Sequence, residues 1–158
     1  MKNLSLILVL IFGFPLVIYS QENDRVKLIE DFYRELCIKD VAPEEIVSNY
    51  IGYSGEDQYN KAIHMVIDLR NLGSEESGHF FLLKRDISEN DFFISSYDNF
   101  SEIDKAKFKN LAKNKRKNVY KINLKNTIPQ YILMEKDKII SFFGFQKAGS
   151  DDHIFIVF

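Results

Sequence analysis

The fold is decided by residues 131–158, which read YILMEKDKIISFFGFQKAGSDDHIFIVF. Three runs rich in β-branched and aromatic residues, at 131–134, 139–145 and 154–158, are separated by short polar turns. Runs of this composition, joined by loops this brief, predict antiparallel strands in a meander. Both alternating sets of residues in the last run are apolar, so we expect both of its faces to be covered.

A further strand is predicted just before this stretch, over residues 119–125. Its apolar residues recur at every second position and alternate with polar ones, which predicts one buried face and one face in water. Pro129 lies in the link to the next strand, where its missing N–H costs no ladder hydrogen bond. Gly144 stands among phenylalanines and predicts a bulge or bend in the run 139–145.

The N-terminal half predicts three helices. Apolar residues recur at spacings of three and four over about 23–39, with Asn23 or Asp24 as the N-cap. Pro43 suits the first turn of a second helix, which we expect to end at Gly52 in a left-handed cap. A third helix is predicted over 56–72, with a glycine ending it.

The segment 74–100 fits helix or strand. The compact apolar run 79–83 has the length of a strand but lacks alternation, and the aromatic residues at 92–97 fit either a short strand or a helical turn. Ser101 is expected to cap the next helix, which the pattern predicts to run to about Asn114.

The first 20 residues have the features of a secretory signal peptide. A positive start precedes an apolar run over 4–18, and Ser20 offers a small residue before a cut at Gln21. The run is shorter than the ~20 residues that a spanning helix needs, and a glycine and a proline interrupt it. We therefore expect residues 1–20 to be removed and 21–158 to form a single exported domain, periplasmic or secreted, without a membrane span. The alternative is retention by an uncleaved N-terminal anchor.

The cysteine and aromatic content indicates how the folded domain is stabilised. Cys37 is the only cysteine, so an intramolecular disulfide is impossible although an oxidising compartment would permit one. Its place in an apolar helix face predicts a buried, unreactive thiol. The 14 Phe and 8 Tyr provide large side chains for a core.

Charge is distributed unevenly along the chain. Residues 21–104 carry 19 acidic and 8 basic side chains, a balance of −11, whereas residues 105–158 carry 4 acidic and 12 basic ones, a balance of +8. A solvated helix face explains such a bias, and a site for an anionic partner is the sharper interpretation. Lys105, Lys109, Lys113 and Arg116 would lie within roughly 80° of one another at helical spacing, and Lys115 and Lys117 continue this cationic stripe. The candidate binding residues in the cationic helix 105–117 are Lys105, Lys109, Lys113, Arg116 and Lys117.

Catalytic signatures are missing from the sequence. The run Gly52-Tyr53-Ser54-Gly55 fails the nucleophile-elbow pattern because Glu56 stands where the second glycine is required. His64 lies four residues before Asp68, but a zinc site needs three or four ligands. No local motif indicates a catalytic residue, a metal, a cofactor or a phosphate loop, and no nucleic-acid-binding motif is present.

The order of elements from Val26 to Phe158, with the hairpin 131–145, resembles small exported bacterial proteins of the NTF2-like and cystatin-like group. The resemblance implies a curved sheet wrapped on helices, in a group that includes enzymes, ligand carriers and proteins without known activity. We therefore predict an α+β domain in which three or four N-terminal and central helices pack on a C-terminal antiparallel meander of three to five strands.

Three functions agree with these patterns. The first is an exported, non-enzymatic binding or interaction protein whose partner is a protein or a small anionic ligand of unknown identity. The second is a small hydrolase or isomerase with a cavity between sheet and helices and His64 or His79 as the base. The third is a binder of anionic ligands or envelope surfaces through the cationic helix 105–117.

Overall fold

The structure is a computed structural model that describes residues 4–38, 40–72 and 78–158, with side chains from Gln21 onward. Four helices come first: α1 (Leu4–Cys37), α2 (Pro43–Tyr50), α3 (Glu56–Leu72) and α4 (His79–Ser88). The strands are β1 (Phe92–Ser96), β2 (Val119–Leu124), β3 (Gln130–Glu135), β4 (Lys138–Ser141), β5 (Gly144–Gln146) and β6 (His153–Phe155). Between β1 and β2 lie a 3₁₀ turn (Tyr97–Asn99) and the short helices α5 (Glu102–Ala106) and α6 (Lys113–Arg116). The predicted α+β class is confirmed.

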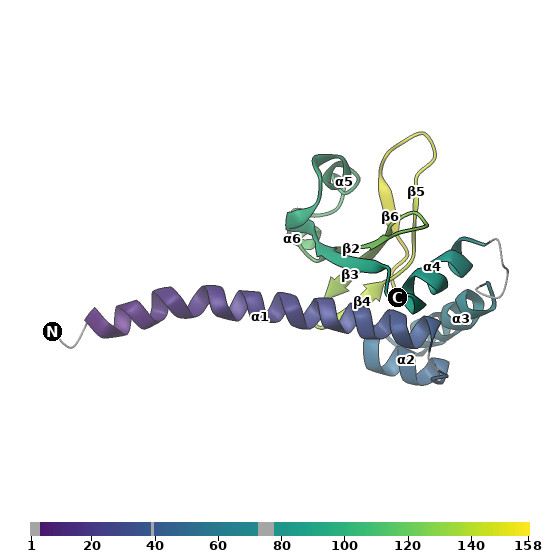
Figure 1. Cartoon of the computed structure of the whole chain (residues 1–158), viewed down its shortest axis with the longest axis horizontal. Helices are drawn as coiled ribbons and strands as arrows, with labels where there is room; N and C mark the ends of the chain where they lie inside the picture. Colours follow the sequence, from purple (N-terminus) through teal and green to yellow (C-terminus); the bar gives the residue numbers. More distant parts are fainter. Residues whose placement is uncertain (1–3, 39, 73–77) are drawn as a thin grey trace.

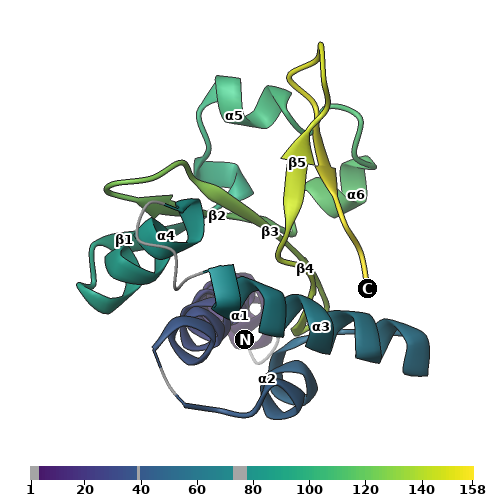
Figure 2. The same cartoon turned by 90° about the vertical axis from the view of Figure 1, so that its right-hand side faces the viewer.

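A four-stranded antiparallel sheet, in the order β1-β2-β3-β4, divides the molecule into two layers. Helices α1 to α4 lie on one side, and α5, α6 and the β5–β6 hairpin lie on the other (Figures 1 and 2). Each strand pairs with its neighbour in the chain, with Ile94 opposite Ile122 and Tyr120 opposite Ile132. The turn between β3 and β4 needs only two residues because Lys136 adopts a left-handed backbone (φ 53°).

The second face of this sheet is covered only in part. The expected wet face of 119–125 is wrong at Lys121, whose side chain is 17% exposed, and is confirmed at Lys125, whose side chain is 63% exposed. Tyr120, Ile122, Ile132 and Met134 point into a core shared with α1 to α4. Val119, Tyr131 and Leu133 point the other way, into a second core with Phe100 and Phe108. The predicted alternation of residues between the two faces of β2 is confirmed. Lys121 on the second face is held away from water by the buried carboxylate of Asp104, and a sequence pattern does not reveal this contact.

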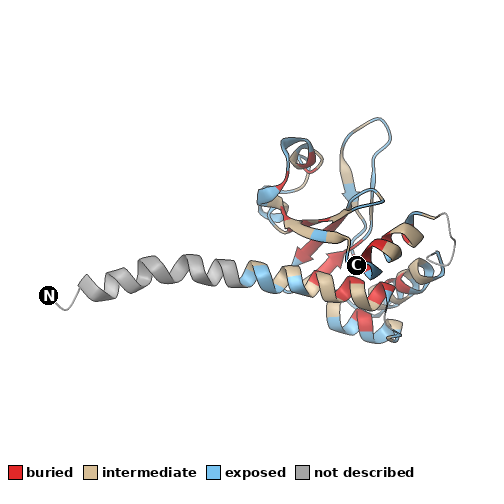
Figure 3. Cartoon of the chain, viewed as in Figure 1, coloured by how far each residue is buried: buried red, intermediate tan, exposed pale blue. Residues whose placement is uncertain are grey.

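Helix α1 carries the main hydrophobic contact of the helical layer. Ile29, Phe32, Tyr33 and Leu36 are buried, and Figure 3 shows the buried part of α1 toward its C-terminal end. The ring centroid of Phe32 lies 5.0 Å from that of Phe142, which follows β4. The expected N-cap at Asn23 or Asp24 is wrong because the helix is continuous from Leu4. A good N-cap residue does not break a helix whose preceding residues can continue it. Within the part of the chain that the structure describes, no helix is long and apolar enough to span a membrane.

The second and third helices have the predicted positions, but the role of Gly52 differs from the expected one. Its φ is not positive, so it forms no left-handed cap. Instead its N–H donates to the carbonyl of Ile139 at 2.8 Å, beside an isolated parallel bridge between Ile51 and Ile139. A Cβ at this position would lie 3.1 Å from the Cβ of Lys138. Gly52 therefore permits a close approach of the α2–α3 link to β4.

The middle segment resolves into two elements. The run at 79–83 belongs to α4, in which Phe80, Leu83 and Ile87 are buried at spacings of three and four. The aromatic residues that follow form the edge strand β1 and the 3₁₀ turn. The expected end of the third helix at Gly73 lies outside the described residues.

The C-terminal run 139–145 is not one strand. β4 ends at Ser141, and after Phe142 and Phe143 the chain leaves the sheet to form the separate β5–β6 hairpin. The expected cover on both faces of 154–158 is also wrong, since Ile154 is 38% exposed and Val157 is 55% exposed. The bulge or bend expected at Gly144 is a bend at Phe142, where the chain leaves the four-stranded sheet.

Candidate functional site

An apolar pocket of about 320 Å³ lies between the helical layer and the point where the chain leaves β4. Its size is in the range of small-molecule sites. Leu36 of α1, Leu69 of α3 and Leu83 of α4 form its helical walls, and Phe142 and Phe143 close it on the sheet side. The helical residues reach one space because each lies on the inward face of its own helix.

The mouth of the pocket is polar. His79, the first residue of α4, lines it together with Gln130, the first residue of β3. The Nε2 atom of His79 lies 2.6 Å from the amide nitrogen of Gln130, and Nδ1 lies 2.5 Å from the hydroxyl oxygen of Thr127. Because the Gln130 amide is a donor, this geometry fits a neutral ring that accepts at Nε2 and donates from Nδ1.

Electrostatics agree with that tautomer. Burial lowers the pKa of His79 below its usual 6.5, since packing at the mouth removes water from the charged form. At pH 7 the ring is therefore neutral. The pocket offers apolar walls and an uncharged group of hydrogen-bonding side chains at one end.

The continuous cationic helix predicted over 105–117 is wrong. Ser101 caps α5 as expected, because its Oγ accepts a hydrogen bond from the N–H of Asp104 at 3.2 Å. However, α5 ends at Ala106 and α6 covers only 113–116. The guanidinium of Arg116 folds back to donate to the carbonyls of Lys109 and Leu111, which stabilises the turns between the two short helices.

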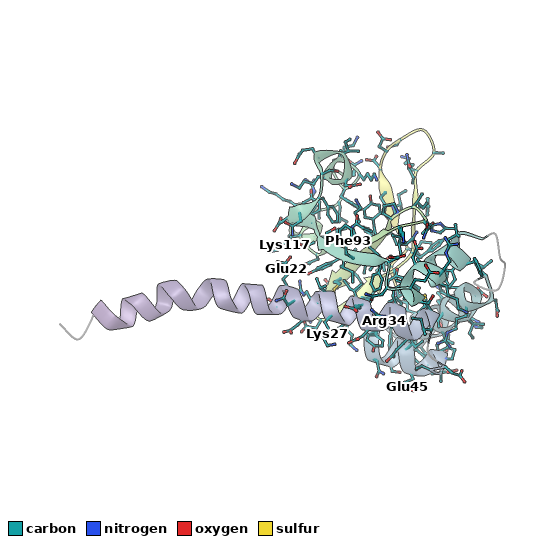
Figure 4. The ribbon with its side chains drawn as sticks, viewed as in Figure 1. Glu22, Lys27, Arg34, Glu45, Phe93 and Lys117 are labelled. Carbon is teal, nitrogen blue, oxygen red and sulfur yellow. The ribbon has the colours of Figure 1, made fainter. Side chains whose placement is uncertain are left out.

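The five candidate cations consequently do not form one stripe. Lys105 pairs with Glu102 at 3.2 Å, and Lys109 lies 3.7 Å from Asp152 of the hairpin. Lys117 lies near Glu22 of α1 (Figure 4), and the two line one shallow pocket. Lys113 is exposed. Binding of anions by these residues stays a prediction.

A buried carboxylate that the sequence did not single out organises the second core. Asp104 is 8% exposed and accepts hydrogen bonds from Lys107 (2.9 Å), Lys121 (2.8 Å) and the Tyr131 hydroxyl (2.6 Å). Burial alone would raise the pKa of Asp104, but the hydrogen bonds from these three donors outweigh it and hold the pKa well below its usual range. Two of the partners lie 17 and 27 residues away in the chain, so no local motif could have indicated this cluster.

The other histidines lie outside the pocket. His64 is exposed on α3. His153 packs against the rings of Phe108 and Tyr131, and burial, aided by the nearby Lys107, lowers its pKa to about 4. Among the described residues, no group of three or more histidine, cysteine or acidic side chains is placed to hold a metal ion.

Cys37 is buried as predicted, and burial raises its pKa to about 12. At pH 7 it is a thiol, and thiols are weak nucleophiles compared with thiolates. The residue acts as part of the apolar core.

Comparisons of this chain with protein-family models, with curated proteins and with solved structures found no match. The resemblance to the NTF2-like and cystatin-like group therefore stays a prediction.

Proposed function

We propose that this protein is an exported, non-enzymatic binding protein that takes up a small apolar molecule with an uncharged polar end. The pocket between α1, α3, α4 and the end of β4 carries this proposal, because most of its lining is apolar and two of its polar residues, His79 and Gln130, contact each other.

The walls determine the apolar part of the ligand. Leu36, Leu69, Leu83 and Phe142 bury carbon surface, and each CH₂ group removed from water is worth about 0.8 kcal/mol. The mouth determines the polar part. Both ring nitrogens of the neutral His79 are taken by Thr127 and Gln130, so the uncharged amide oxygen of Gln130 is the acceptor left for a ligand. An amide oxygen accepts from a hydroxyl or amide and not from a carboxylate.

The experiment is a calorimetric titration of residues 21–158 with decanol and with decanoate at pH 7. We expect decanol to bind more tightly than decanoate. Leu69→Trp, which fills the pocket from α3, should weaken decanol binding by at least tenfold. Ile67→Trp is the matched control, because Ile67 lies on the same helix, is 37% exposed and does not line the pocket.

Two results would refute this assignment. One is equal binding by wild type and Leu69→Trp, which would place the ligand elsewhere. The other is a preference for decanoate that survives in His79→Ala, which would show that the mouth does not select the polar end.

A hydrolase or isomerase is the second candidate, and His79 is the observation that favours it. This histidine lines the pocket and is neutral at pH 7, as a general base must be. Its unprotonated Nε2 accepts from the Gln130 amide, so a substrate would have to displace that amide to reach the base. Turnover of short-chain esters that is lost in His79→Ala but kept in His64→Ala would support an enzyme. Without such turnover, the binding function is favoured.

A further inference from the structure

A second groove, of about 370 Å³, lies on the opposite side of the sheet from the apolar pocket. The edge of β6 forms one wall and the segment after α5 forms the other. Leu111, Leu133 and Phe155 give it an apolar floor, and Val157 extends that surface toward the C-terminus. Lys115 and Lys147 stand at its rim.

The backbone of β6 presents hydrogen-bonding groups to this groove. The N–H of Ile156 donates to the carbonyl of Phe143 at 3.1 Å, and that of Lys147 donates to the carbonyl of Asp152 at 2.9 Å. These two bonds fix the alternation of the hairpin, because hydrogen-bonded and non-hydrogen-bonded pairs take turns along an antiparallel ladder. Phe155, opposite Gly144, is therefore in a non-hydrogen-bonded pair, and its N–H and C=O point away from β5.

One outward group on this edge already has a backbone partner. The N–H of His153, the first residue of β6, donates to the carbonyl of Lys107 at 2.9 Å. At this end of β6 the edge therefore already pairs with the segment that follows α5. Further along the chain, the outward backbone groups of Phe155 and Val157 have no backbone partner among the described residues. The edge is thus half used. The groove is lined by both halves, and the outward backbone groups that an added strand could pair with are those of Phe155 and Val157.

The charge of the rim indicates the chemistry of an occupant. Lys109 on the same side is paired with Asp152, and Asn110 also donates to Asp152 at 2.8 Å. Lys115 and Lys147 form no ion pair within the described part of the chain. Two exposed ammonium groups at an apolar groove are complementary to carboxylates that flank an apolar side chain.

We propose that the groove binds an extended peptide segment of a partner protein, which adds a strand to the free edge of β6. The peptide places an apolar side chain over Leu111 and Phe155 and acidic side chains near Lys115 and Lys147. In this mode of binding, backbone hydrogen bonds between peptide and strand provide the affinity. Every second side chain of the peptide faces the groove, and these side chains provide the selectivity. A second copy of this chain fits less well, because its own lysines would meet those of the first copy.

The test uses a short fluorescent peptide that alternates glutamate and valine, with anisotropy measured on residues 21–158 at low salt. We expect binding that weakens at least tenfold in the double variant Lys115→Glu, Lys147→Glu. The control variant Lys113→Glu, Lys136→Glu makes the same charge change at exposed sites that do not line the groove, and it should retain binding.

Two further peptides test the backbone pairing. Each carries N-methyl groups on alternate residues, in complementary sets, so only one set removes the N–H groups that face β6. One peptide should lose binding at least tenfold and the other should keep it. Equal binding by both would show a purely ionic contact and overturn the proposal, as would a dimer that forms through this edge and excludes the peptide. Leu69→Trp should not affect either result, which keeps this test independent of the apolar pocket.

Discussion

At the scale of single residues, the contact between Gly144 and His153 shows how closely the second core is packed. A Cβ on Gly144 would lie 2.3 Å from the Nε2 atom of His153, so only glycine permits the imidazole to lie across β5. The ring packs against those of Phe108, Tyr131 and Phe155, and its buried Nε2 has no hydrogen-bond partner among the described residues. Because burial disfavours the protonated ring, we expect the stability of the folded protein to fall in acid.

We predict that His153 makes the free energy of unfolding depend on pH between 4 and 6.5. Its pKa in the native state is about 4, below the 6.5 of an unfolded chain, so the unfolded state binds the proton first as pH falls. Stability from this residue is complete above pH 6.5 and decreases toward pH 4. The ring is partly exposed, so after allowance for solvent screening the loss is about 1–2 kcal/mol.

Urea denaturation at several pH values would measure this effect. His153→Gln should flatten the dependence between pH 4 and 6.5, whereas His64→Gln, at an exposed position on α3, should leave it unchanged. Equal slopes in the two variants would contradict the assignment. Lys107 and Tyr131 face His153. Burial raises the pKa of Tyr131, so its phenol keeps its proton throughout this window. Despite its burial, the hydrogen bonds to the nearby Asp104 hold its pKa below the usual 3.8. Its contribution to stability is therefore lost as pH falls through the ordinary carboxyl range, at and below the acid end of this window.

At the scale of elements, Arg70 of α3 joins two helices by satisfying backbone carbonyls. Its guanidinium donates to the carbonyls of Glu35 (2.9 Å) and Leu36 (3.2 Å) at the end of α1 and of Val41 (2.6 Å) in the following link. The last carbonyls of a helix have no partner within the helix, and a cation there also opposes the negative end of the dipole. Arg70 thus acts as a C-terminal cap supplied from another element.

Replacing this cap should weaken the helical layer. We predict that Arg70→Gln lowers the free energy of unfolding by about 2 kcal/mol, since a shorter amide cannot reach three carbonyls. Lys61→Gln is the control, an exposed cation on the same helix, and it should change stability by less than about 0.5 kcal/mol. Similar denaturation midpoints for the two variants would show that the cap has no energetic role.

The elements that the sequence predicted correctly are those with local causes. The helix over 56–72 and the strands around 120 and 132 follow from apolar spacing, and the cap at Ser101 follows from its own side chain. The errors have distant causes. Arg116 turns back on the carbonyls before it and ends the expected helix, and Asp104 draws Lys121 out of water. The sequence offers His79 as a candidate base. Its partners Thr127 and Gln130 lie 48 and 51 residues away in the chain, so local sequence patterns could not predict that the three side chains meet at the pocket.

At the scale of the whole molecule, the described residues of the two hydrophobic cores all lie within 21–158. Among the residues whose side chains are described, the first buried one is Ile29. Arg25 is the first residue with a described hydrogen bond to the sheet layer, at 3.3 Å from Asn118. A chain that begins at Gln21 therefore keeps every described contact of the two cores.

We predict that expression of the full chain in an exporting bacterial host yields a mature protein that begins at Gln21. Intact mass and N-terminal sequencing of the exported fraction would identify the first residue. Ser20→Leu, which places a bulky residue at the cut, should retain the full length in the cell envelope. Full-length wild-type protein in the exported fraction would show that the signal is not cleaved.

The close contact of Gly52 with β4 has a consequence for behaviour at high concentration. An outer strand with free backbone groups is a template for fibril growth. Here the Gly52 N–H occupies the Ile139 carbonyl, and the ammonium of Lys138 is held by the carbonyls of Ser48 and Asn49 at 3.0 and 2.7 Å. Together with the bond from the Phe158 N–H to the Ile140 carbonyl at 3.1 Å, these contacts cover this border of the sheet. A Cβ at position 52 would lie 3.1 Å from the Cβ of Lys138, so a larger residue there should loosen the cover and raise the tendency to aggregate.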